Sequence, residues 1–65
     1  MPFAIEVAGT LPHAVRMGLV DLVGDAALVE RGGRTVLSAR DQSAMIGILH
    51  RLNDLGLDID RIERT

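Results

Sequence analysis

The chain has 65 residues, no cysteine and a formal net charge of −2 at pH 7, and 48% of its residues are hydrophobic. Its length allows one domain, residues 1–65, and the lack of cysteine excludes disulfides, thiolate nucleophiles and cysteine-bound metals. The acidic balance and a single aromatic residue, Phe3, argue against nucleic acid as a partner, because phosphate binding needs a basic surface and single strands need stacking platforms.

Small domains need a stabilising partner more often than large ones. A chain of this length buries only about 60% of the surface that it exposes when unfolded. Because disulfides and cysteine-bound metals are excluded, we expect a homo-oligomer, most simply a homodimer, or an assembly with another protein. The N-terminus, MPFAIEVAGT, has no basic leader region, and no segment approaches the ~20 apolar residues of a membrane span, so we expect a cytoplasmic protein without a membrane partner.

Two hydrophobic patterns predict the first strand and the first helix. Residues 3–8 alternate between large apolar side chains and small or charged ones, which is typical of a strand with one buried face. Gly9 and Thr10 end this strand, and we expect a helix from Pro12 to Gly24 with Thr10 as its cap, since proline is tolerated in a first helical turn. The apolar stripe of this helix consists of Val15, Leu19, Leu22 and Val23.

A hairpin is predicted in the middle of the chain. Residues 25–31 and 34–40 are two strand-like runs separated by Gly32-Gly33, and two glycines can both take the positive φ angles of a tight hairpin turn. This turn fixes the register of the two strands. The expected pairs are Arg31 with Arg34, Val29 with Val36, and Leu28 with Leu37.

The segment RDQSAMIGILHRLNDLGLDIDRIERT, residues 40–65, predicts a second helix followed by a last strand. Either Asp41 or Ser43 caps the helix, and Gly56 followed by Leu57 is typical of a helix C-terminus in which glycine is left-handed. The strand is expected from Leu57 to about Arg64, which gives the order βαββαβ. The apolar stripe of the second helix consists of Met45, Ile48, Leu49, Leu52 and Leu55.

The two helix-to-strand junctions resemble each other at an offset of 33 residues. The offset places identical or similar residues on one another: Asp21-Leu22 on Asp54-Leu55, Asp25 on Asp58, Val29 on Ile62, and Glu30-Arg31 on Glu63-Arg64. A duplicated βαβ unit would explain the echo, and so would chance similarity of composition. The predicted architecture does not depend on which is correct.

This element order predicts an α+β, ferredoxin-like βαββαβ plait: a four-stranded antiparallel sheet in the order 4-1-3-2 with two helices on one face. One hairpin pair, Val29 with Val36 or Leu28 with Leu37, must lie on the open face, because adjacent strand residues point opposite ways. Exposed apolar surface usually marks an interface, so we expect the open face to bind a second copy. The expected interface residues are Ala4, Glu6, Ala8, Val29 and Val36.

The second helix and last strand also carry a family resemblance. Residues 41–64 resemble the pattern Asp-Gln-x-Ala-Leu-x-Gly-Leu-Leu-x-Arg-Leu-x-Asp-Leu-Gly-Leu, followed by a strand with basic residues at its end, of small actinobacterial proteins without an assigned function. The chain departs from the pattern where Met45 and Ile46 replace the Leu-His that is usual there. The resemblance implies a bacterial source and a shared fold, but no chemistry. The matching positions are Gln42, Ala44, Gly47, Arg51, Asp54 and Gly56.

Two further resemblances suggest alternative functions. The layout is similar to that of ACT regulatory domains, which bind amino acids at the first strand-to-helix turn, and this would place a ligand at Gly9 and Thr10. The acidic residue and glycine that those domains usually pair at this turn are absent. Met1-Pro2-Phe3 resembles the start of small tautomerases, which implies Pro2 as a general base after Met1 is removed. Those enzymes need arginines around the proline and a longer first helix.

The remaining polar residues do not predict a metal site. His13 and His50 have no ligand-type partner at helical spacing, so we expect surface histidines. An acidic cluster runs from the end of the second helix along the last strand and is interleaved with arginines. Calcium loops need oxygen ligands around a glycine bend, whereas this segment is strand-like, so we expect a solvated, self-compensating charged edge. These acidic residues are Asp54, Asp58, Asp60 and Glu63.

The sequence therefore predicts a non-enzymatic, dimeric interaction or regulatory module without a cofactor. An ACT-like small-molecule sensor and an N-terminal-proline tautomerase are the alternatives.

Overall fold

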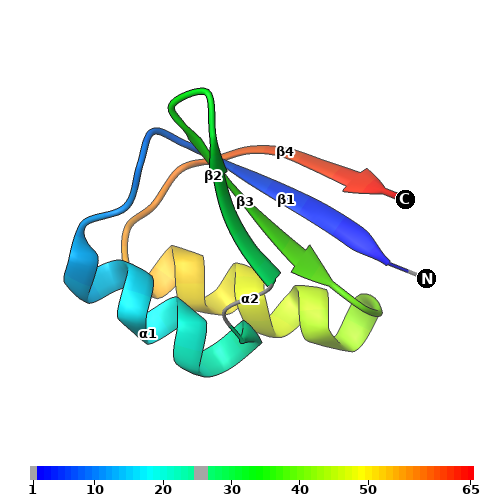
Figure 1. Cartoon of the computed structure of the whole chain (residues 1–65). Helices are drawn as coiled ribbons and strands as arrows, with labels where there is room; N and C mark the ends of the chain where they lie inside the picture. Colours follow the sequence, from blue (N-terminus) through cyan, green and yellow to red (C-terminus); the bar gives the residue numbers. More distant parts are fainter. Residues whose placement is uncertain (1, 25–26) are drawn as a thin grey trace.

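The computed structural model describes residues 2–24 and 27–65 and confirms the expected plait. The strands form one antiparallel sheet in the order β2-β3-β1-β4, which is 4-1-3-2 read from the other edge. Both helices lie on one side of the sheet (Figure 1), and Pro2 lies next to Thr65. The elements are β1 (Phe3–Ala8), α1 (His13–Val23), β2 (Leu28–Arg31), β3 (Arg34–Ala39), α2 (Gln42–Asp54) and β4 (Ile59–Arg64).

The hydrophobic core fills the space between the sheet and the helices. The central strand pair supplies Ile5 opposite Leu37, and both side chains are fully buried. Leu28 pairs with Leu37 and is also buried, whereas Val29 is 44% exposed. The Gly32-Gly33 turn therefore gives the expected register. The exposures show which hairpin pair lies away from the helices: it is Val29 with Val36. The core consists of Ile5, Val7, Leu19, Leu28, Leu37, Ala39, Ile48 and Leu52.

Thr35 is a polar residue in this otherwise apolar layer. Its hydroxyl donates a hydrogen bond to the carbonyl of Gly9 at 3.1 Å, and the side chain is fully buried. Gly9 has φ 79°, a conformation that other residues rarely adopt. The bond therefore holds the turn after β1 against β3.

Helix α1 differs from its prediction in its N-cap and in one residue of its apolar stripe. Its N-cap is Pro12, with no side-chain hydrogen bond, so Thr10 is not the cap. Leu22 is 51% exposed and borders a groove between the helices, so it does not belong to the buried stripe. Val20 packs against the core in addition to the expected Val15, Leu19 and Val23.

Helix α2 has the caps that the sequence indicates. The Asp41 carboxylate accepts a hydrogen bond from the amide of Ala44 at 2.8 Å, which selects Asp41 over Ser43 as the cap. At the other end Gly56 has φ 73°, its amide donates to Asn53, and the amide of Leu57 donates to Leu52. This is the Schellman pattern. Leu55 lies beyond the last helical residue and is 38% exposed, so it does not complete the apolar stripe.

Strands β2 and β4 begin later in the chain than expected. Asp25 and Ala26, in the first part of the expected 25–31 strand, lie outside the described residues, and β2 begins at Leu28. Strand β4 begins at Ile59 because Leu57 belongs to the cap of α2. No helix in the described residues has the length and apolarity that crossing a membrane requires.

The echo at 33 residues does not extend to the strand faces. Val29 faces away from the helices, whereas Ile62 pairs with Ile5 and lies on the helix side. A bulge in β4 near Asp60 shifts the alternation of side chains, so equivalent positions in β2 and β4 point in opposite directions.

We predict that Thr35→Val lowers the free energy of unfolding by about 1–3 kcal/mol, because it leaves the Gly9 carbonyl without its hydrogen bond at nearly unchanged volume. Urea unfolding followed by circular dichroism measures this. Thr35→Ser, which keeps the hydroxyl, is the control. A stability of Thr35→Val equal to that of the wild type would contradict the assigned bond.

We predict that Asp41→Ala destabilises the domain by about 1 kcal/mol, because the amide of Ala44 loses its acceptor. Ser43→Ala, two residues further along, removes a hydroxyl that makes no cap bond and should cause no comparable loss. The same unfolding experiment measures both variants. Equal losses in the two would show that the cap is wrongly assigned.

Candidate functional site

The five residues expected at an interface all lie on the side of the sheet that the helices leave bare. In the observed register Glu6 is paired with Val36, and Val36 with Val29, so their side chains point to the same side. Val29 is largely exposed and Val36 half-buried. Ala4 and Ala8 flank Glu6 on β1. Their side chains are small, so they protrude little between the valines and β4. We call this side of the sheet, residues 4, 6, 8, 29, 31, 34, 36, 38, 61 and 63, the open face.

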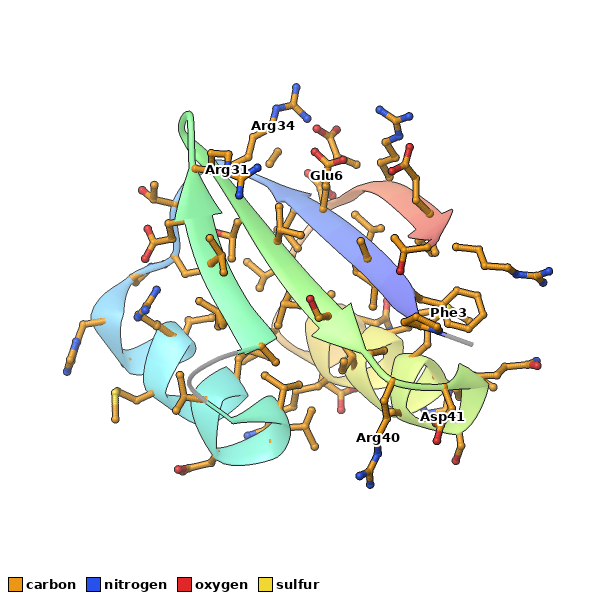
Figure 2. The ribbon with its side chains drawn as sticks, turned by 45° about the vertical axis from the view of Figure 1, so that its right-hand side comes forward. Phe3, Glu6, Arg31, Arg34, Arg40 and Asp41 are labelled. Atoms are coloured by element: carbon orange, nitrogen blue, oxygen red, sulfur yellow. The ribbon has the colours of Figure 1, made fainter. Side chains whose placement is uncertain are left out.

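Charged side chains surround the apolar centre of the open face. Arg34 crosses over β1, where its pairing partner is the small Ala8, and forms an ion pair with Asp60 of β4. The same guanidinium lies 3.9 Å from the Glu6 carboxylate. Arg31, Arg34 and Glu6 stand on the side of the sheet away from the helices (Figure 2). The sequence did not reveal the Arg34–Asp60 pair, because only the bulge turns Asp60 towards this side.

Strand β4 is the least covered part of the sheet. Its six residues are all exposed, and the helices pack mainly on β1, β2 and β3. Ile59 and Ile62 are 38% and 45% exposed on the helix side. Arg61 and Glu63 form an ion pair with each other along the opposite side of the strand. The expectation of a self-compensating charged edge agrees with this pairing and with the Arg34–Asp60 pair.

Pro2, the alternative catalytic residue, lines a pocket of about 650 Å³ at the end of the sheet. Arg40 is the one cationic residue among the described residues that line it. The remaining walls come from the last turn of α1, the end of β3 and the first half of α2, and they are mainly apolar. The Pro2 carbonyl accepts a hydrogen bond from the amide of Thr65 at 2.9 Å, which fixes this end of β1 beside β4. Met1 lies outside the described residues.

The alternative ligand site at Gly9 and Thr10 is an exposed turn. The Gly9 carbonyl is already the acceptor for the Thr35 hydroxyl. Neither residue belongs to the two pockets described here, the one at Pro2 and the groove between the helices. The turn therefore has a structural role in fixing the start of the β1–α1 connection.

The two histidines are separate surface residues. His13 is the exposed first residue of α1, and His50 lines the groove between the helices together with Arg51 and Asp54. Within residues 2–24 and 27–65, no three His, Asp or Glu side chains are arranged to hold a metal ion.

Comparison with known families places the whole fold in one family. The family described as "Domain of unknown function (DUF8691)" matches residues 3–62, from the first strand to the middle of β4, and the chain belongs to it. This agrees with the expected membership of an uncharacterised family, while the expected bacterial source stays a prediction. No curated protein and no solved structure gives a significant match.

Proposed function

We propose that this member of the DUF8691 family is a non-enzymatic interaction module that works as a homodimer, with the open face as its contact surface. The observation that carries the proposal is the apolar pair of exposed Val29 and half-buried Val36, at the centre of a face with charged side chains around it. Protein interfaces commonly have this arrangement of an apolar centre and a polar rim.

The charges of the open face suit a contact between two copies. Arg34 is already paired with Asp60 and lies near Glu6, and Arg61 is paired with Glu63. Burial of a paired charge costs less free energy than burial of an isolated one. The apolar centre can therefore approach a partner with both of these arginines, Arg34 and Arg61, already paired with carboxylates.

The size of the domain also favours coupled folding and association. The folded chain exposes 4203 Å², and a standard interface buries about 800 Å² per partner, roughly a fifth of this surface. The described residues contain no disulfide or metal cluster that would stabilise the monomer instead. A second copy would contribute a large share of the total apolar burial.

A second candidate function is supported by the pocket at Pro2. A freed prolyl amine and the Arg40 guanidinium would lie in one largely apolar pocket, which combines a base with a cation for an acidic substrate. Removal of Met1 is required for this reaction. The single arginine in the described lining and the short α1 favour the interaction module over the enzyme.

We predict that Val29→Lys and Val36→Lys each weaken self-association about tenfold or more, because each would bury an ammonium group in the apolar centre. Light scattering over a concentration series measures the association. Met17→Lys is the matched control, since Met17 has a similar exposure, 46%, but lies on α1. A wild type that stays monomeric at high concentration, or equal effects of all three changes, would contradict the proposed surface.

For the second candidate we predict that wild type and Pro2→Ala give the same rate in an enol–keto tautomerisation assay, after mass spectrometry has established whether Met1 is removed. The non-enzymatic module requires no contribution from the proline. A rate that falls with Pro2→Ala and with Arg40→Ala would instead support catalysis in this pocket.

A further inference from the structure

Strand β4 is an edge strand whose outward backbone groups can be assigned from one hydrogen bond. The amide of Thr65 donates to the Pro2 carbonyl at 2.9 Å, so residue 65 directs its backbone groups towards β1. Successive residues of an antiparallel strand alternate between the two sides. Counting back through the regular part of the β1–β4 register, Glu63 and Arg61 also point to β1, while Arg64 and Ile62 point outward.

Outward amides and carbonyls of an edge strand are free to bond to another strand. The sequence of β4 is complementary to itself in the antiparallel direction. With Ile62 at the centre, Arg61 of each copy lies opposite Glu63 of the other, on the same side of the sheet. Opposite charges directly across such a pair are stabilising.

We propose that β4 pairs antiparallel with β4 of a second copy, about a two-fold axis at Ile62, and joins the two sheets into one. Ile62 of one copy then lies against Ile62 of the other, and their outward amides and carbonyls bond reciprocally. The two isoleucines are 45% exposed in the single chain, so their contact removes apolar surface from water.

The backbone and the charges together select this register. Only outward residues can bond across the new edge, and in the regular part of β4 these are Ile62 and Arg64, so Ile62 must face Ile62 or Arg64 of the second copy. The register with Arg64 places Glu63 of one copy opposite Glu63 of the other. Like charges directly opposite each other are destabilising, which leaves the register centred on Ile62.

The bulge near Asp60 limits how far the new pairing extends. This register places Asp60 opposite Arg64 of the second copy, but Asp60 is turned towards Arg34 on the open face. Arg64 lies over the Phe3 ring on the helix side, with its guanidinium carbon 5.8 Å from the ring centre. The two Arg61–Glu63 pairs therefore supply the charge match.

This contact does not rest on the proposed use of the open face. Directly paired residues point to the same side, so the open faces of both copies lie on one side of the joined sheet. The apolar centre at Val29 and Val36 stays free for a different contact. The two surfaces can be tested separately for that reason.

The experiment uses Arg61→Glu and Glu63→Arg, each combined with Val36→Lys so that only the edge contact is measured. Both positions are well exposed, with side-chain exposures of 62% and 46%, and circular dichroism checks that the variants fold. Either variant alone places like charges opposite each other twice, and we expect association about tenfold or more weaker than that of Val36→Lys alone. An equimolar mixture restores opposite charges at both pairs, and we expect it to form a heterodimer.

Sedimentation velocity on each variant and on the mixture gives the result. Recovery of the dimer only in the mixture supports the edge contact in this register. Association of either single variant as strong as that of the Val36→Lys parent, failure of the mixture to recover, or a parent that is monomeric at all concentrations would overturn it. None of these outcomes depends on whether the open face associates, because Val36→Lys and Val29→Lys test that face by themselves.

Discussion

The packing of two short helices on one side of a four-stranded sheet governs the rest of this structure. Ile5 and Leu37 on the two central strands meet Leu19 from α1 and Leu52 from α2, and all four side chains are fully buried. The two helices, of 11 and 13 residues, pack mainly on β2, β3 and β1. They leave β4 largely uncovered. One layer of core thus leaves two parts of the sheet uncovered: the open face and the edge at β4.

Both uncovered parts have features of a contact surface. The open face places Val29 and Val36 inside a set of paired charges, and β4 exposes Ile62 between Arg61 and Glu63. Charges on an edge strand normally discourage pairing with other chains. In β4 the same charges favour one antiparallel register with a second copy and disfavour the neighbouring register. They therefore restrict how a partner strand can pair.

Local sequence signals predicted most of the fold. Gly32-Gly33 set the hairpin register, Gly56 ended α2, and Asp41 was one of two expected caps. These features depend on residues within a few positions of each other, for which turn and cap chemistry is specific.

Features that depend on distant residues were harder to predict. Leu22 has the helical spacing of the α1 stripe, yet it is 51% exposed and borders the groove between the two helices. The Arg34–Asp60 pair needs both the bulge in β4 and the small Ala8 between them. Five expected interface residues share one face because strand alternation is regular in β1, β2 and β3, but the bulge could not be anticipated from β4 itself.

In the proposed assembly a second copy covers the parts of the sheet that the helices leave bare. Thermal unfolding of the wild type, measured over a roughly hundredfold range of protein concentration, tests this assembly. If only folded chains associate, the midpoint temperature of unfolding depends on concentration. We expect a midpoint that rises steadily with concentration, together with a dimeric or larger mass at the upper end. The same midpoint at every concentration, with a monomeric mass throughout, would contradict it.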